Sequence, residues 1–214
     1  MKINLEILQS AYIYDKKEIV ELQTKELVPK MVTRRRLTRS AKIAVYLASK
    51  VSFTQGRIIY GSSFGEIPAT AHILKSIKDK EGISPTHFQN SVYNTAVSYL
   101  SMLYNNEEEI MTISSGDNTS KNILKSGAIK ALDGDTILLL AIETLDIENI
   151  EEVNKCIDFL ECGVALKVKI TNEKANIHCD LKQNKEKLPN SLIDMINIAK
   201  NCNENSRNIV EIEI

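Results

Sequence analysis

Residues 136–142 read Thr-Ile-Leu-Leu-Leu-Ala-Ile, and this run constrains the fold more than any other segment of the chain. A strand with one face in water alternates apolar and polar residues, whereas this run does not alternate. Such a pattern is typical of a parallel strand that helices cover on both faces. The preceding Asp133-Gly134-Asp135 is a turn signal. We therefore expect a buried strand in a layered α/β domain.

Strand-like and helix-like segments alternate along the rest of the chain, which favours an α/β fold with a mixed, mostly parallel sheet. Residues 3–12 are either amphipathic or extended, and their periodicity does not decide between the two. The other expected strands are 57–62, 110–113, 164–170 with a hairpin partner at 176–181, and 209–214. The expected helices are 16–27, one capped by Thr38 or Ser40, 69–79, 88–104, 118–130 capped by Asp117, part of 146–161, and 189–201.

Composition excludes several classes of protein. The chain has 214 residues, of which 43% are hydrophobic and 26% charged, which suits one globular domain. A net charge of -1 gives no general attraction to nucleic acid or to an anionic membrane. No apolar run is long enough for a membrane span, and no secretory signal is evident, so we expect a cytoplasmic protein. The four cysteines lack Cys-x-x-Cys spacing, and we expect neither a metal nor a cofactor.

Residues 111–118, Met-Thr-Ile-Ser-Ser-Gly-Asp-Asn, have the form of a strand-to-helix turn that presents a nucleophile. Residues 84–96 precede them with the pattern Ser-Pro…Ser-Val-x-Asn-x-Ala. In order and spacing, these motifs and the apolar strand resemble the amino-terminal half of a β-ketoacyl synthase, in the thiolase-like superfamily. The chain is most similar to short members that are reduced to this half and lack the cysteine. Residues 33–145 match best, and 146–214 form a looser carboxyl-terminal α/β extension of one domain spanning 1–214.

The resemblance implies a single thiolase-like half whose nucleophile is missing. In active ketosynthases a cysteine in this turn accepts an acyl group, and backbone N–H groups stabilise the charge on the attacked carbonyl. Aligning Ser115-Gly116 with the motif puts Ile113 in the cysteine position, where it cannot be acylated. His72, His87 and His178 do not match the two catalytic histidines of the family's other half. The expected degenerate turn and pocket consist of Ile113, Ser114, Ser115, Gly116 and Asp117.

Two features near this turn have alternative interpretations. Ser114 or Ser115 could replace the cysteine, but a serine hydroxyl is nearly inert without a positioned base, and turn hydrogen bonding is the simpler role. Tyr93 and Asn94 belong to the Ser-Val-x-Asn motif and are expected either to line the pocket or to pack with their polar groups hydrogen-bonded.

Partners are expected at two other segments. A basic cluster could hold the acidic helices of an acyl carrier protein, or could be solvated and paired locally; it consists of Arg34, Arg35, Arg36 and Arg39. It lacks the aromatic interleaving of a nucleic-acid footprint. In ketosynthases the counterpart of strand 110–113 pairs antiparallel with a partner subunit, so the resemblance implies a homodimer or a heterodimer with a complete ketosynthase; the alternative is an internal strand.

Three functions therefore stand side by side. The first is a non-catalytic subunit, similar to a chain length factor, that shapes the acyl pocket in fatty-acid or polyene-type chain building. The second is an acyl hydrolase or transferase that uses Ser114 or Ser115. The third is a structural scaffold or interaction protein without a ligand, in which the turn is only a core element.

Overall fold

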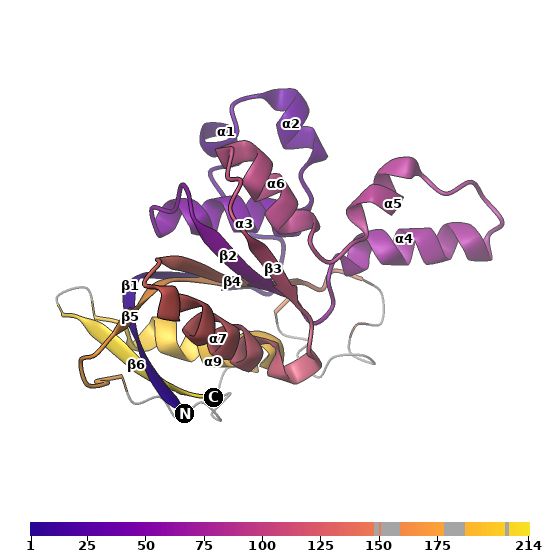
Figure 1. The fold of residues 1–214 in the computed structure, drawn as a ribbon. Helices are drawn as coiled ribbons and strands as arrows, with labels where there is room; N and C mark the ends of the chain where they lie inside the picture. The colour runs from indigo at the N-terminus through magenta and orange to yellow at the C-terminus, as the bar shows by residue number, and fades with distance from the viewer. Residues whose placement is uncertain (148–149, 151–158, 178–186, 204–205) are drawn as a thin grey trace.

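The computed structural model describes residues 1–147, 150, 159–177, 187–203 and 206–214. Its described strands form one sheet in the order β3-β2-β4-β5-β1-β6 (Figure 1). Their bounds are β1 (Lys2–Asp15), β2 (Arg57–Gly61), β3 (Ile110–Ile113), β4 (Ile137–Thr144), β5 (Glu161–Thr171) and β6 (Asn208–Glu213). The expected layered α/β fold with a mixed sheet is confirmed. In the described part of the chain, we find no helix with the length and hydropathy needed to cross a bilayer.

The sheet changes direction at β4. This strand pairs in parallel with β2, which is itself parallel to β3, and pairs antiparallel with β5. β1 lies between β5 and β6 and is antiparallel to both. The three parallel strands end at the same edge, so the loops that follow β2, β3 and β4 come together there. This edge positions the candidate site.

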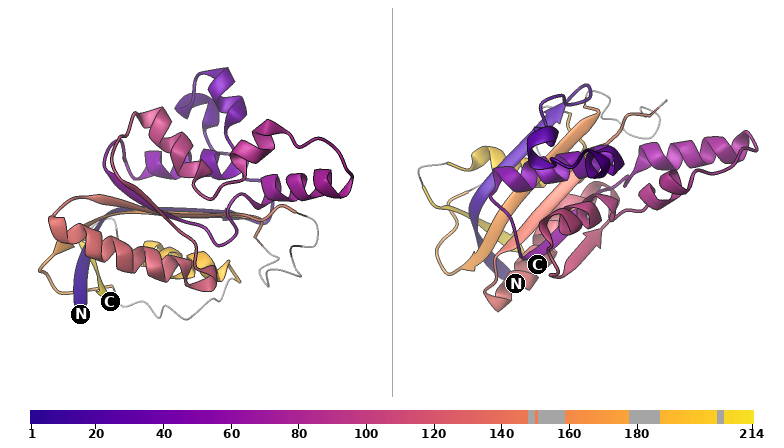
Figure 2. Two further views of the ribbon diagram at one scale, coloured as in Figure 1. Left: turned by 45° about the vertical axis from the view of Figure 1, so that its right-hand side comes forward. Right: turned by 90° about the horizontal axis from the view of Figure 1, so that it is seen from above.

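Helices cover both faces of the sheet (Figure 2). On one face lie α3 (Arg39–Lys50) and α6 (Thr95–Tyr104), which pack on Leu138 and Leu140 of β4. On the other lie α7 (Thr119–Lys130) and α9 (Asn190–Asn201), which pack on Ile137 and Leu139. Each side of β4 thus contacts its own core, and all eight of its residues are buried. This double burial explains why the apolar run does not alternate.

Several helix predictions need correction. Residues 16–27 were expected to be helical, but β1 runs to Asp15 and only α1 (Thr24–Leu27) forms a helix. An unexpected helix, α2 (Met31–Arg36), follows. Thr38 does cap α3, since its hydroxyl accepts a hydrogen bond from the amide of Ala41 at 3.1 Å. The predicted segments 146–161 and 176–181 lie largely outside the described residues.

The helix expected at 88–104 is two helices, α5 (Pro85–Asn90) and α6. The break has a local cause. The Ser91 hydroxyl donates to the carbonyl of Phe88, and the Thr95 hydroxyl donates to the carbonyl of Val92. These side chains occupy carbonyls near the junction, which is how serine and threonine compete with helical hydrogen bonds.

α4 (Ile67–Lys78) and α5 project from the body of the protein as a helical hairpin (Figures 1 and 2). We call residues 67–94 the arm. Pro68 starts α4 near residue 67, where proline is favoured, rather than at the predicted residue 69. Neither α4 nor α5 contains a buried residue. The arm therefore adds little to the core of its own chain.

Candidate functional site

The strand-to-helix turn forms as the sequence predicts. β3 ends at Ile113, the 3-10 turn η1 (Gly116–Asn118) follows, and α7 continues from it. The Thr119 hydroxyl accepts from the amide of Ser115 at 3.1 Å and donates to the carbonyl of Gly116 at 2.7 Å. Gly116 has a φ of 56°, in the left-handed region that glycine tolerates. The turn is thus fixed by its own hydrogen bonds, while Ser114 and Gly116 are exposed.

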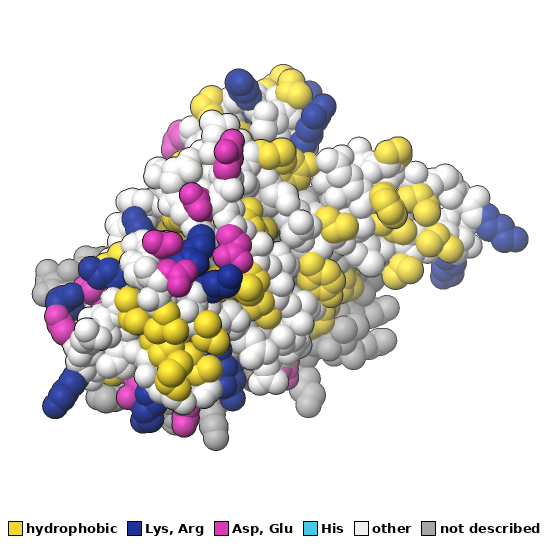
Figure 3. Space-filling view, in the orientation of Figure 1, with side chains coloured by type: hydrophobic (Ala, Val, Ile, Leu, Met, Phe, Trp, Pro, Cys, Tyr) yellow, Lys and Arg dark blue, Asp and Glu magenta, His cyan; other side chains and the backbone are white. Residues whose placement is uncertain are grey.

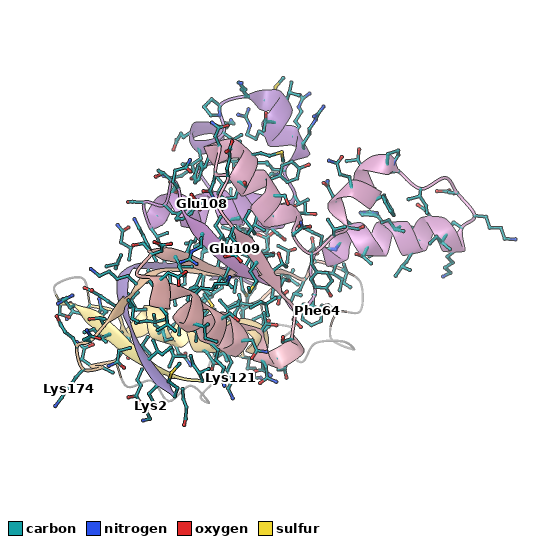
Figure 4. All side chains as sticks on the ribbon, viewed as in Figure 1. Lys2, Phe64, Glu108, Glu109, Lys121 and Lys174 are labelled. Atoms are coloured by element: carbon teal, nitrogen blue, oxygen red, sulfur yellow. The ribbon has the colours of Figure 1, made fainter. Side chains whose placement is uncertain are left out.

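Two predicted site residues meet at one backbone carbonyl. The loop after β2 places the carbonyl of Ser63 where it accepts from the Tyr93 hydroxyl at 3.3 Å and from the Ser114 hydroxyl at 3.4 Å. The amide of Ser62 donates to the carbonyl of Ile113 at 3.3 Å. The structure therefore brings Ile113, Ser114 and Tyr93 together around the β2 loop. The labelled Phe64 marks this loop near the end of β3 (Figure 4).

Asp117 and Asn94 have other surroundings. Asp117 was expected to cap the following helix, but the N-cap of α7 is Asn118, which makes no side-chain capping bond. The Asp117 carboxylate instead accepts from the Asn190 amide at 3.3 Å, which joins the turn to α9. Asn94 is exposed and occupies the N-cap of α6, without a side-chain capping bond.

A buried carboxylate contacts the loop that follows β2, beside the turn, and was not predicted. Glu143, near the end of β4, accepts from the Ser62 hydroxyl at 2.7 Å, the Ser63 amide at 2.6 Å and the Ser191 hydroxyl at 2.7 Å. The Phe64 amide adds a longer bond of 3.3 Å. Burial raises the pKa of Glu143 even though these four donors favour its charged form. The carboxylate ties the β2 loop, which contacts the turn, to α9.

The signal for Glu143 was present in the sequence. It is an acidic residue directly after six apolar residues of a strand, a position where a side chain is buried. A buried carboxylate requires several hydrogen-bond donors or a cation. Its partner Ser191, however, lies 48 residues further along the chain, and no local pattern indicates that contact.

A second buried acid, Glu66, stands where the arm leaves the body. Its carboxylate accepts from the Thr38 hydroxyl at 2.8 Å. Burial raises the pKa of Glu66 to about 7, although the hydrogen bonds from Thr38 and Ser40 favour the charged form. Next to it, Gly65 has a φ of 60°, and the ring of Tyr93 packs so closely that an added Cβ would lie 3.1 Å from it. The base of the arm is thus tightly packed.

The raised pKa of Glu66 predicts a pH-dependent stability. Because the folded-state pKa of about 7 exceeds the ordinary value of 4.5, the folded state holds the extra proton between these pH values. The free energy of unfolding should therefore fall as pH rises through this window, by roughly 3 kcal/mol from this group. Urea unfolding from pH 4.5 to 8 would measure it. The stability difference between wild type and Glu66→Gln should change with pH by this amount, and a constant difference would contradict the assignment.

The four arginines of the basic cluster differ in their contacts. Arg39 forms a two-bond pair with the buried Glu161, with both distances 2.6 Å, and also donates to the carbonyl of Ile19. Arg34 donates to the carbonyls of Val28 and Pro29 at 2.8 and 3.2 Å. Arg35 and Arg36 are exposed at the end of α2. Carrier-protein docking by this cluster stays a prediction, and Arg35 and Arg36 are its most accessible members.

A serine nucleophile would need a base beside it. Among the hydrogen bonds of the described residues, neither Ser114 nor Ser115 is joined to a histidine, lysine or carboxylate. His72 and His87 stack on each other in the arm, with ring centres 4.8 Å apart, and His178 lies outside the described residues. The described turn therefore lacks the second member of a nucleophile–base pair.

A groove of about 1030 Å³ lies along β1, which β2, β4 and β5 separate from β3 in the sheet. It is lined by β1, the end of α3 and the end of α9, including Tyr12, Tyr46 and Lys50. Its polar lining differs from the apolar lining expected of an acyl pocket. The turn, where the predicted residues meet, is the better candidate for the functional site.

Comparison with known proteins bears on the fold and the family of this chain. No curated protein matches the sequence. Among solved structures, the ketosynthase ApeO in complex with its chain length factor ApeC from Xenorhabdus doucetiae matches with a TM-score of 0.68 and 20% identity, over 90% of this chain and 92% of that chain. The ishigamide ketosynthase/chain length factor matches with a TM-score of 0.61 and 9% identity, over 81% of this chain and 63% of that chain.

A third structure, the type II polyketide synthase acyl carrier protein in complex with its ketosynthase bound to the hexaketide (AntDE:AntF), matches with a TM-score of 0.59 and 10% identity. The match covers 79% of this chain and 63% of that chain, so here and in the ishigamide protein the chain spans less than two thirds of its relative. These likenesses concern the fold. The family model described as "Beta-ketoacyl synthase, N-terminal domain" matches residues 9–210. With this match over nearly its whole length, the chain belongs to the β-ketoacyl synthase N-terminal domain family.

Proposed function

We propose that this chain is a non-condensing ketosynthase-like subunit that pairs with a complete ketosynthase and limits the length of its acyl product. One observation carries the proposal. At the strand-to-helix turn, the resemblance places the acylated cysteine at Ile113, whose hydrocarbon side chain is partly buried and packs against the core. Such a residue cannot form a thioester but can occupy space in an acyl pocket.

Two further points support this role. The printed descriptions of similar structures include ketosynthases in complex with chain length factors, and a ketosynthase in complex with an acyl carrier protein. The turn itself is exposed at Ser114, Gly116 and Asp117, so a partner subunit would have to enclose any pocket built there. On the same grounds, we propose that Arg35 and Arg36 bind an acyl carrier protein.

The test uses a reconstituted system of this chain with the complete ketosynthase and acyl carrier protein of the same genome. Ile113→Ala removes side-chain volume, and we expect longer acyl products, whereas Ile113→Phe should shorten them. Ile110→Ala is the matched control, because it is the same change at the other end of β3. Mass spectrometry of the carrier-bound products measures the chain length. An unchanged product distribution with Ile113→Ala would contradict the proposal and leave the scaffold hypothesis.

The serine hypothesis has its own measurement. After incubation with an activated acyl thioester, we expect the intact mass of this chain to stay unchanged. Among the described residues, no base is hydrogen-bonded to Ser114 or Ser115. Acylation that disappears in Ser115→Ala or Ser114→Ala would instead assign an acyl-transfer or hydrolase activity to the turn.

A further inference from the structure

β1 has a strand neighbour on only one side over half of its length. Up to Ile7 it pairs with β6, whereas from Gln9 to Asp15 it pairs with β5 alone. Burial changes at the same point, because Ile7 is buried and no residue from 8 to 15 is. Among the described strands, none covers the outer side of this half. Residues 8–14 thus form an open sheet edge, which β2, β4 and β5 separate from β3.

β6 stops opposite Ile7 because the chain enters it from a helix. The side chain of Asn208, the first residue of β6, accepts from the amide of Asn203 at 2.7 Å and donates to the Asn203 carbonyl at 3.0 Å. Asn203 follows the end of α9 directly. These bonds tie the start of β6 to α9, so β6 does not extend further along β1.

The ladder determines which backbone groups point out of this edge. The carbonyl of Asp15 accepts from the amide of Leu160, on the β5 side. Bonding residues alternate along an antiparallel strand, so Ser10 and Tyr12 direct their amides and carbonyls outward. No described residue makes a backbone bond to either of them on that side. Residues 8–14 also contain neither the proline nor the charged side chains that commonly protect an edge.

The groove of about 1030 Å³ runs along this edge. The ends of α3 and α9, which lie on opposite faces of the sheet, form its walls. A lysine lies over a tyrosine ring on each face. The Lys50 ammonium is 5.0 Å from the ring centre of Tyr46, and the Lys200 ammonium is 5.7 Å from that of Tyr12. These cation–π contacts hold two positive charges beside the edge.

The described lining of the groove carries an excess of positive charge. Its charged members are Glu6, Lys50, Lys200 and Arg207. Arg207 donates to both carboxylate oxygens of Glu6 at 2.8 Å, so the charges of these two residues offset each other. Lys50 and Lys200 supply the excess. Successive side chains of a strand point to opposite faces, so two adjacent acidic residues of an added strand would point toward the two lysines.

We propose that residues 8–14 of β1 bind an extended, acidic segment of a partner protein as an added strand. Strand addition obtains affinity from backbone bonds and selectivity from side-chain contacts. Here the two lysines select acidic residues, and Leu8 (37% exposed) and Tyr12 (42% exposed) add apolar contact. The apolar side chains that gather over the arm in Figure 3 lie on helices and offer no such edge. The inference is independent of the proposed function, which concerns the turn after β3.

A synthetic peptide tests the edge. The probe has about seven residues, the length of the open stretch, with valine and threonine around two adjacent acidic residues. We expect fluorescence anisotropy to show binding to the wild-type protein, and NMR to show slower hydrogen exchange at the amides of Ser10 and Tyr12. Two further copies are N-methylated at the two alternating sets of residues. One copy should bind at least about tenfold more weakly than the other, because only one set of amides faces β1.

Protein variants test the side chains and the backbone separately. Lys50→Glu with Lys200→Glu should weaken binding of the acidic probe at least about tenfold and strengthen binding of a probe with two lysines instead. Lys78→Glu is the matched control, because Lys78 is exposed and lies in the arm. Ser10→Pro removes an outward amide, which an edge strand tolerates, and should weaken both pairs of interactions. Circular dichroism checks that each variant stays folded.

Three results would overturn the inference. The first is a wild-type protein that does not bind the acidic probe at millimolar concentration. The second is equal binding of the acidic and the lysine probe to the wild type. The third is a wild-type dimer in sedimentation equilibrium that Ser10→Pro dissociates, which would make a second copy the occupant of the edge. None of these results bears on the Ile113 experiment, which measures product length at β3.

Discussion

Glu143→Ala should destabilise the protein by about 4 kcal/mol or prevent folding, which is a large share of the stability of such a domain. The substitution leaves the hydroxyls of Ser62 and Ser191 and the amide of Ser63 without their acceptor. Each buried polar group without a partner costs about 1–3 kcal/mol. Urea unfolding followed by circular dichroism would measure the loss.

Two controls separate this network from a general effect of losing a charge. Glu143→Gln keeps one acceptor oxygen and should cost about half as much. Glu108→Ala removes an exposed carboxylate and should change the free energy of unfolding by less than about 0.5 kcal/mol. A Glu143→Ala protein within about 1 kcal/mol of wild type would show that the carboxylate does not hold the β2 loop and α9 together.

Arg39→Ala should destabilise the protein by about 3 kcal/mol. The Glu161 side chain is 3% exposed, and among its hydrogen bonds to described residues only the one from the Ile19 amide would remain after Arg39 is removed. Breaking a buried pair by deleting one partner costs about 3–5 kcal/mol, and the partial exposure of Arg39 argues for the lower end. The same unfolding experiment measures this change.

The basic cluster provides the comparison. Arg35→Ala lies four residues away and is exposed, so we expect a change below about 0.5 kcal/mol. Arg39→Lys retains the charge but loses the two-bond geometry, and its stability should fall between those of the wild type and Arg39→Ala. Equal effects of Arg35→Ala and Arg39→Ala would contradict the distinction between a structural and a solvent-facing arginine.

The sequence patterns predicted the features that depend on residues close together in the chain. The apolar run at β4 indicated burial on both faces, and successive residues of β4 do pack into opposite cores. The Thr38 cap also follows from one side chain and one nearby amide. The strand-to-helix turn at residues 113–119 was recognisable because strand, turn and helix are contiguous.

Tertiary contacts decided what the patterns missed. Residues 16–27 have apolar positions that suit a helix, yet Ile19 is held by Glu161 and Arg39, which are remote in sequence. Glu143 depends on Ser191 in the same way. At the turn, Asp117 does not cap the following helix as expected but accepts from Asn190, which is remote in sequence. A single sequence does not reveal such distant or competing partners.

The position of β1 has a consequence for how the protein emerges from the ribosome. β1 lies between β5 and β6, with Tyr12 opposite Val164 and Leu5 opposite Val210. β1 is therefore translated long before the two strands that flank it in the sheet. Contacts of such wide sequence separation slow folding and leave nascent strands open to wrong pairing. Chaperones should bind the nascent chain most strongly while β1 has no neighbouring strand to pair with.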